Sequence, residues 1–126
     1  MSLPPSVEES ARRAGVVWVD LGDGPRVVWH VWHDGAIYVV CGGQEQQLPR
    51  AGTAETAVLV LRGKASAGDP VVECTAAVSR IEPGSESWLS VVPALHDARW
   101  NPPDGEAQPE RWARESTVLR LEPLAG

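Results

Sequence analysis

Hydrophobic residues dominate two short stretches separated by Asp34-Gly35, a dipeptide typical of tight β-turns. Both stretches, Arg26–His33 and Ala36–Cys41, are rich in β-branched and aromatic residues, which favour strands. We therefore predict a β-hairpin over residues 26–41. Neither strand alternates cleanly between apolar and polar residues, so both faces should be covered, as in a barrel wall that also contributes to an interface. In the first strand the two faces are Val27, Trp29, Val31 and His33 on one side, and Val28, His30 and Trp32 on the other.

The same strand-like pattern recurs elsewhere, interrupted by turns rich in glycine and proline. The longest pair, Thr56–Lys64 and Val71–Ile81, predicts a second hairpin. Apolar residues spaced as on one helix face predict a helix over Glu86–Arg99, capped by Ser85 or Ser87 and kinked or shortened by Pro93. The remaining predicted elements are strands at Val16–Leu21 and Thr117–Leu121 and short helices at about residues 5–13 and Gln108–Ala113.

These elements amount to about six strands and two or three short helices, joined mainly as hairpins. A chain of 126 residues suits one domain, which we place over residues 1–126. Because hairpins make neighbouring strands antiparallel, the expected fold class is mostly β: a six-stranded antiparallel barrel with short helices as accessories.

Composition narrows the classes of function. The formal net charge is −6 and the pI is near 5.0, which argues against a nucleic-acid partner and against docking on an anionic membrane. The N-terminus lacks the basic and apolar regions of a signal peptide, and every apolar run is of strand length. The two cysteines, Cys41 and Cys74, form no disulfide framework. We therefore expect a cytoplasmic protein with no membrane partner.

The most informative polar feature is the pair Arg62 and Lys64, which lie two residues apart on a predicted strand and so share a face. Lys64 is the only lysine in the chain. Arginine offers a planar fork of donors and lysine a point charge, so the pair is suited to a phosphate or carboxylate. The ordinary alternative is that the two cations pair with Glu73 across the hairpin or face water.

Other candidate chemistry is sparse. His30 and His33 are three residues apart on a strand, so they face opposite sides and cannot easily hold one metal ion. We expect no metal site. The chain contains no nucleophile-elbow, P-loop, dinucleotide-binding or zinc-protease motif, so catalytic residues remain unassigned. Its six tryptophans suit an interface or a pocket for a flat ligand, with core packing as the ordinary alternative.

With the strands in this order, the chain resembles the flavin-binding split barrels of the pyridoxamine 5′-phosphate oxidase-like superfamily, particularly its small actinobacterial-type members. The resemblance is carried by Trp29–Val40, Ala57–Val60 and Val78–Trp88 and extends over most of the chain. It implies a homodimer that binds FMN, or alternatively the deazaflavin F420 or no cofactor, in a groove between subunits. The resemblance also implies that the protein is an oxidoreductase that acts on a small-molecule substrate in this groove.

The resemblance also implies which residues hold the cofactor. Gln46 and Gln47 occupy the segment where FMN-binding members often carry a lysine. The motifs of true pyridoxamine-phosphate oxidases are absent near Val71–Glu73, so that particular reaction is not expected. The alternative is a non-catalytic cofactor-binding or dimerising module on the same fold that has lost the cofactor phosphate site. The implied cofactor-binding set is Arg26, Trp29, Trp32, Arg62, Lys64, Gln46 and Gln47.

Overall fold

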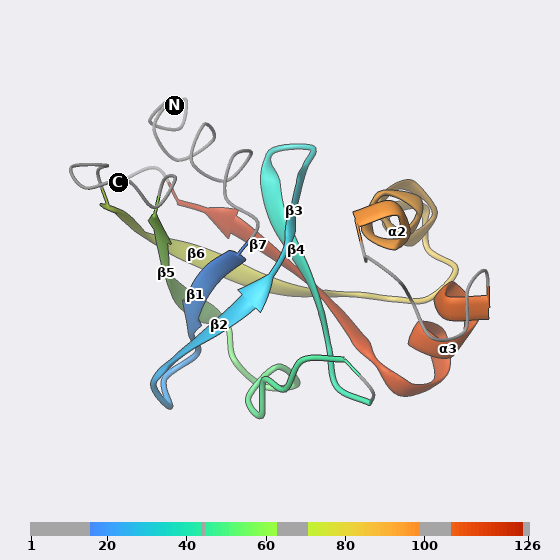
Figure 1. Cartoon of the computed structure of the whole chain (residues 1–126), viewed down its shortest axis with the longest axis horizontal. Coiled ribbons are helices and arrows are strands. Elements are labelled where there is room, and N and C mark those ends of the chain that lie inside the picture. Colours follow the sequence, from blue (N-terminus) through green and yellow to red (C-terminus); the bar gives the residue numbers. More distant parts are fainter. Residues whose placement is uncertain (1–15, 44, 63–70, 99–106, 125–126) are drawn as a thin grey trace.

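The computed structural model describes residues 16–43, 45–62, 71–98 and 107–124, with the backbone alone for Arg62 and Val71. The predicted helix near residues 5–13 lies outside these residues. The described part forms seven strands and two helices (Figure 1): β1 (Val16–Asp20), β2 (Pro25–Trp29), β3 (Val31–His33), β4 (Ala36–Cys41), β5 (Thr56–Arg62), β6 (Val71–Ile81), α2 (Glu86–Ala98), α3 (Gln108–Glu115) and β7 (Thr117–Pro123).

The strands form one curled sheet in the order β2-β1-β5-β6-β7-β4-β3, in which every neighbouring pair is antiparallel. Figure 1 shows the sheet wrapping into an open half-barrel, with α2 and α3 together on one side. The prediction of a mostly β, antiparallel barrel with short helices is therefore confirmed. The second predicted hairpin is also confirmed as β5–β6.

The strand count differs from the six expected, because the predicted strand Arg26–His33 is divided at His30. The first part, β2, pairs with β1, whereas the second part, β3, pairs with β4 at the opposite edge of the sheet. The predicted hairpin over residues 26–41 is thus wrong for its first half and correct for β3–β4. The faces predicted for this stretch still hold, since Trp29 and Val31 pack on one side of the sheet and Val28 and Trp32 on the other.

The side chain of Gln46 stabilises the break at His30. Its amide oxygen accepts a hydrogen bond from the Trp29 N–H at 2.7 Å, and its amide nitrogen donates to the carbonyls of Trp29 at 3.0 Å and Val40 at 3.2 Å. One side chain therefore satisfies backbone groups where the chain passes from β2 to β3, at a point where ladder hydrogen bonds are interrupted.

The β3–β4 turn has the conformation that its sequence predicts. Asp34 has φ 48° and Gly35 has φ 79°, so both central residues are in the left-handed region that tight hairpins require. The register places His33 opposite Ala36 and Val31 opposite Tyr38.

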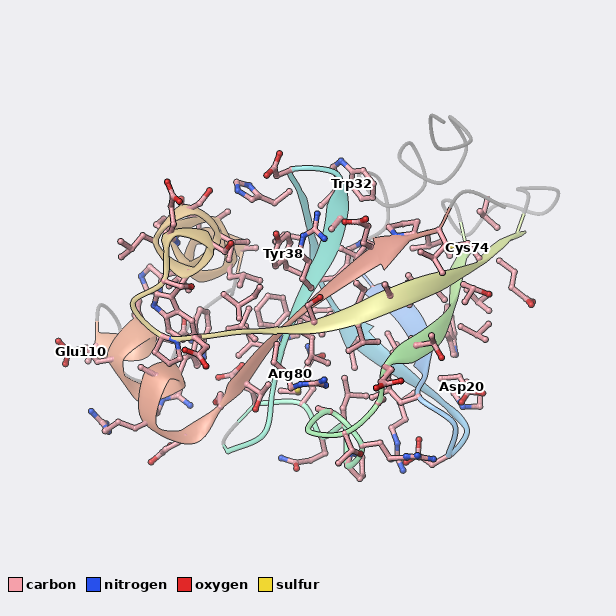
Figure 2. The ribbon with its side chains drawn as sticks, turned by 180° about the vertical axis from the view of Figure 1, so that it is seen from behind. Asp20, Trp32, Tyr38, Cys74, Arg80 and Glu110 are labelled. Carbon is pink, nitrogen blue, oxygen red and sulfur yellow. The ribbon has the colours of Figure 1, made fainter. Side chains whose placement is uncertain are left out.

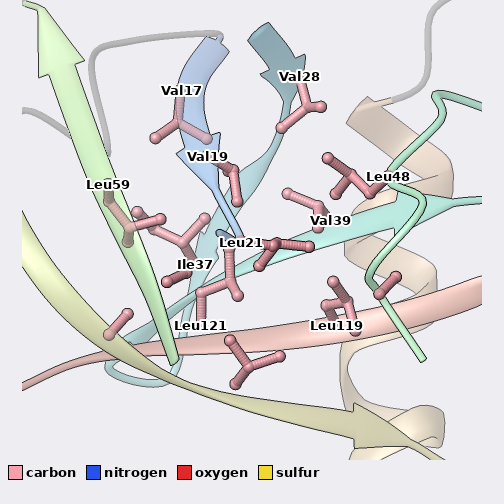
Figure 3. Packing of buried hydrophobic residues seen from close by; sticks show 14 of the residues in the cluster. Val17, Val19, Leu21, Val28, Ile37, Val39, Leu48, Leu59, Leu119 and Leu121 are labelled. Atoms are coloured by element: carbon pink, nitrogen blue, oxygen red, sulfur yellow. The ribbon is translucent and has the colours of Figure 1, made fainter. Parts of the chain in front are cut away.

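Two hydrophobic clusters lie on opposite faces of the sheet. The barrel interior contains inward-facing residues of most strands, including Val19, Ile37, Leu59 and Leu121 (Figure 3). The second cluster joins the outer faces of β4 and β7 to Trp88, Val91, Val92 and Leu95 of α2 and to Trp112 of α3. Strand β4 lies between the clusters, and all six of its residues are buried.

The helices largely follow the predicted boundaries. The Ser85 hydroxyl accepts a hydrogen bond from the Trp88 N–H at 3.2 Å, so Ser85 caps α2 as expected. Pro93 lies inside α2 without ending it, because the helix continues to Ala98. Helix α3 extends two residues beyond its predicted end, to Glu115. None of the helices in the described ranges is long and apolar enough to cross a membrane.

Candidate functional site

The residues predicted to bind a cofactor are spread over several parts of the barrel. Arg26 lies at the start of β2, where its guanidinium is 3.5 Å from the carboxylate of Asp23. Both side chains are partly exposed, so this ion pair is weak. Arg62 is the last residue of β5 and lies opposite Val71 in the register. The side chains of Arg62 and Lys64 lie outside the described part of the chain, and their role stays a prediction.

Trp29 and Trp32 lie on opposite faces of the sheet. Trp29 packs against the cluster beneath α2 and α3, whereas Trp32 packs against the barrel interior. Both are half-buried. They cannot line one face of a flat ligand together, although each remains a candidate on its own face.

Gln46 and Gln47 lie in the loop after β4, and both side-chain amides are engaged. Gln46 makes the three backbone contacts that stabilise the break at His30. Gln47 donates to the carbonyls of Gly43 at 3.3 Å and Glu45 at 3.1 Å. The amide groups that the sequence assigns to a cofactor therefore stabilise the loop itself in this structure.

A buried ion pair next to these glutamines was not predicted from the sequence. Arg111 of α3 donates to the carboxylate of Glu45 at 3.1 Å, and the two side chains are only 6% and 1% exposed. The pair connects the loop after β4 to the helical side of the molecule. The only sequence signal was an acidic residue beside a buried strand, which does not identify a partner 66 residues away.

Apolar residues lie side by side on the outer face of β1, β2 and β5, and three of them are exposed; we call this group the outer strip. Trp18 lies in the register between Val27 on β2 and Val60 on β5. Val16, Val27 and Val58 are 40%, 51% and 39% exposed, which is unusual for valines in a sheet. The outer strip consists of Val16, Trp18, Val27, Val58 and Val60.

A depression of about 300 Å³ borders the outer strip. It is lined by residues of β1, β5 and β6 and of the turn after β1, among them Asp20, Val58 and Thr75. The Asp20 carboxylate accepts hydrogen bonds from the backbone N–H groups of Gly22 at 2.7 Å and Gly24 at 3.3 Å. Asp20 thus fixes the turn that forms one side of the depression.

Neither cysteine has the environment of a reactive thiol. Burial raises the pKa of Cys41 to about 11, and the thiol donates to the Thr117 carbonyl at 3.5 Å. The pKa of Cys74 is also raised, first by burial and then by the neighbouring charge of Glu73. Both environments favour the neutral thiol, whereas a nucleophilic cysteine needs a lowered pKa.

A connected polar group lies on the outer face of β4 and β7. The Arg120 guanidinium donates to the Tyr38 hydroxyl at 3.1 Å and also binds the Glu122 carboxylate. Partial burial acts to lower the pKa of Arg120, but the hydrogen bonds to Glu122 and Tyr38 outweigh it and raise the pKa. The Arg120 guanidinium is therefore fixed in position, and its positive charge is balanced by Glu122.

Comparison with solved structures identifies the fold. The chain is similar to the heme storage protein HutZ of Vibrio cholerae, with 14% identity, coverage of 100% of this chain and 93% of that one, and a TM-score of 0.67. It is also similar to a candidate pyridoxamine 5′-phosphate oxidase of Listeria innocua, with 20% identity, 95% and 92% coverage and a TM-score of 0.64.

A third similar structure is that of a candidate 5-nitroimidazole antibiotic resistance protein of Bacteroides thetaiotaomicron, with 13% identity, 98% and 82% coverage and a TM-score of 0.64. No protein-family model matches the chain, and no curated protein matches it. The chain therefore has the split-barrel fold of the pyridoxamine 5′-phosphate oxidase-like proteins, as its sequence predicted.

Proposed function

We propose that the protein binds a flat, phosphate-bearing cofactor of the flavin type, FMN or F420, between two copies of the chain, as an oxidoreductase of a small molecule. The observation that carries the proposal is the outer strip, an apolar region of the barrel wall that is left exposed beside a depression. A second copy of the chain is the partner that would cover it.

The exposed apolar surface of the outer strip supports the choice of a second copy of the chain as the partner. The outer strip lies across three neighbouring strands, and its three most exposed valines are 39–51% accessible. Contiguous exposed apolar surface on a sheet is typical of a protein–protein or ligand interface. Trp18, at the centre of the register, is half-buried and gives the outer strip an aromatic residue, a type found at interfaces.

The phosphate of the cofactor needs a cation. Among the candidates whose side chains are described, Arg26 is the cation, and it is partly exposed with a long contact to Asp23. It lies on the edge strand of the sheet, on the face of β2 opposite to Val27, so a phosphate that it binds would lie at the edge of the sheet beside the outer strip. Arg62 and Lys64 complete the proposed set, since arginine and lysine bind phosphate through charge-assisted hydrogen bonds.

A second candidate function is a non-catalytic module that stores a flat anionic cofactor or only dimerises. It is favoured by the engaged amides of Gln46 and Gln47, which bind backbone carbonyls of the barrel and of their own loop instead of a phosphate. One structure with this fold is that of a heme storage protein.

A visible-range titration of the purified protein with FMN, F420 and haem tests both functions. Saturable binding of FMN or F420, followed by turnover of a reductant and an acceptor, supports the first proposal. Tight binding of any of the three without turnover favours the second. If no chromophore binds, the cofactor proposal fails.

Substitutions then test the phosphate assignment. Arg26→Ala, Arg62→Ala and Lys64→Ala should each weaken binding by roughly tenfold or more, as expected for loss of one charge-assisted hydrogen bond. Arg114→Ala is the control, because Arg114 is exposed on α3, far along the chain from the outer strip. Equal weakening in all four variants would point to a general effect of net charge instead.

A further inference from the structure

The outer strip lies on a surface formed by four neighbouring strands, in the order β2-β1-β5-β6. Trp18 of β1 lies opposite Val27 of β2 and Val60 of β5. Val60 in turn lies opposite Glu73 of β6. Figure 2 shows Cys74, the next residue of β6, on the side of the barrel away from α2 and α3. The midline of this surface therefore runs between β1 and β5, with β2 and β6 as its two flanks.

The two flanks carry opposite charges. On β6, Glu73 is exposed, and its side chain makes no ion pair or hydrogen bond with another described residue. On β2, Arg26 is partly exposed and has a long contact of 3.5 Å to Asp23. Arg26 leaves β2 on the face opposite to Val27, but β2 is an edge strand, so this side chain is long enough to reach round the edge. The surface thus has an apolar centre, an acidic flank and a basic edge.

Two copies of the chain that pack outer face to outer face can be related by a two-fold axis in two simple ways. An axis across the strands places each β6 flank on the partner's β6 flank, so the two Glu73 carboxylates face each other. An axis along the strands, on the midline between β1 and β5, places each β6 flank on the partner's β2 flank. Glu73 then lies beside the edge that carries the partner's Arg26, and Trp18 lies over the partner's Val60.

The charges of the flanks decide between the two axes. Like charges that face each other across an interface oppose association, whereas opposite charges favour it and fix the register. The curled sheet makes the outer face convex (Figure 1), so two copies meet most closely along the midline, where the apolar residues lie. The flanks lie farther apart, and arginine and glutamate have side chains long enough to span that gap.

We propose that two copies of the chain pack through their outer strips about a two-fold axis along the strands, with Arg26 of each copy bound to the partner's Glu73. The two-fold axis makes this ion pair occur twice. The arrangement rests on the proposed function, which places a second copy of the chain on the outer strip. A guanidinium has donors on more than one edge, so Arg26 can bind the partner's Glu73 and still donate to a cofactor phosphate.

Charge reversal tests the ion pair, by sedimentation velocity over a range of protein concentrations and without cofactor. Arg26→Glu and Glu73→Arg each place like charges together twice, so each should weaken the dimer by roughly tenfold or more. A mixture of the two variants restores both ion pairs in the heterodimer, which should form about as tightly as the unmodified dimer. Arg114→Glu and Glu82→Arg, alone and mixed, are the controls, because they change the net charge equally at exposed positions elsewhere.

A neutral variant tests the direction of the axis. Glu73→Gln removes the ion pair without adding repulsion, so it should weaken the dimer by about threefold. A tighter dimer would overturn the axis, because it would mean that the two Glu73 carboxylates face each other. A mixture of the reversed variants that associates no better than the mixed controls would overturn the ion pair.

The unmodified protein separates this inference from the proposed function. If it sediments as a monomer at every concentration, both the arrangement of the two copies and the interface of the proposed function are wrong. If it is a dimer that responds to the variants as expected but binds neither FMN nor F420, the arrangement is supported and the cofactor proposal alone fails.

Discussion

The two sides of the barrel wall differ in what covers their outer faces. On the side of β4, the outward residues Ala36, Tyr38 and Val40 pack beneath α2 and α3, and the whole strand is buried. On the side of β1, β2 and β5, outward residues of similar apolar character remain exposed, with Val27 at 51%. In the part of the chain that the structure describes, the helices contact β3, β4 and β7 most closely.

The difference shows what two apolar faces on one strand predict about the elements that pack on it. One face always belongs to the barrel interior, because six strands contribute buried residues to that cluster and β3 packs Trp32 against it. The second apolar face predicts a second covering element, and β4 obtains it from helices of the same chain. For β1 and β5, the same pattern predicts a further covering element, and this is the physical basis of the proposal that a second copy of the chain packs there.

The largest expected effect is on the buried ion pair of the covered side. Arg111→Met should destabilise the fold by about 3–5 kcal/mol, because it removes the guanidinium that contacts the buried Glu45 carboxylate. Urea unfolding followed by tryptophan fluorescence measures the free energy of unfolding. Arg114→Met on the same helix is the control, since Arg114 is exposed.

A double variant sharpens this result. Glu45→Gln combined with Arg111→Met removes both charges and should recover a large part of the lost stability. If Arg111→Met alone is no more destabilising than Arg114→Met, the ion pair does not hold the loop after β4 to α3.

Much of the fold could be predicted from local patterns. Turn chemistry at Asp34-Gly35 and the length of the β5–β6 apolar runs depend on neighbouring residues. The turn at Asp34-Gly35 and the β5–β6 hairpin formed as expected, whereas the first half of the hairpin predicted over residues 26–41 pairs elsewhere. The division at His30 could not be predicted in this way. The residues on either side continue the same alternation, and the break is stabilised by Gln46, which lies 17 residues from Trp29.

The candidate sites were harder to predict for the same reason. The outer strip combines residues of β1 and β2 with residues of β5, which lies beyond β3 and β4 in the chain. Sequence spacing cannot reveal such neighbours. The cofactor set came from resemblance alone, and its described members lie on different faces of the sheet.

The second prediction compares two leucines of α2 that differ only in the side they face. Leu95 is fully buried in the cluster between the helices and the sheet, whereas Leu89 is 68% exposed. Leu95→Ala should cost about 2–5 kcal/mol because it leaves a cavity. Leu89→Ala should change the free energy of unfolding by no more than about 0.5 kcal/mol. Similar losses in both variants would mean that α2 is covered on both faces, for example by a partner.

The third prediction concerns Cys41, the last residue of the covered strand β4. Burial raises its pKa to about 11, from 9.0 for an ordinary thiol. Because the folded state then holds the proton more tightly than the unfolded state, the stability gained is complete below pH 9 and is lost as the pH rises to about 11. The loss should be on the order of 2 kcal/mol.

Other groups titrate in the same range, so the measurement is a difference between variants. Free energies of unfolding are compared for Cys74→Ala and for Cys74→Ala with Cys41→Ala from pH 8 to about 11. The gap between the two curves should shrink with rising pH. A gap that stays constant would show that Cys41 is not buried as the neutral thiol.

The smallest effect on folding is expected on the side of the outer strip, where Val27→Lys places a charge on β2 opposite Trp18. Val27 is already half exposed in the chain, so the cost to folding of one copy should be about 0.5 kcal/mol or less.

Assembly should respond much more strongly, because two copies that meet through the strip would bury the new ammonium group. Sedimentation velocity should therefore change from a dimer to a monomer. Leu124→Lys is the control, since Leu124 is similarly exposed but lies outside the strip. Equal sedimentation of Val27→Lys and the unmodified protein would mean that the outer strip is not where two copies meet.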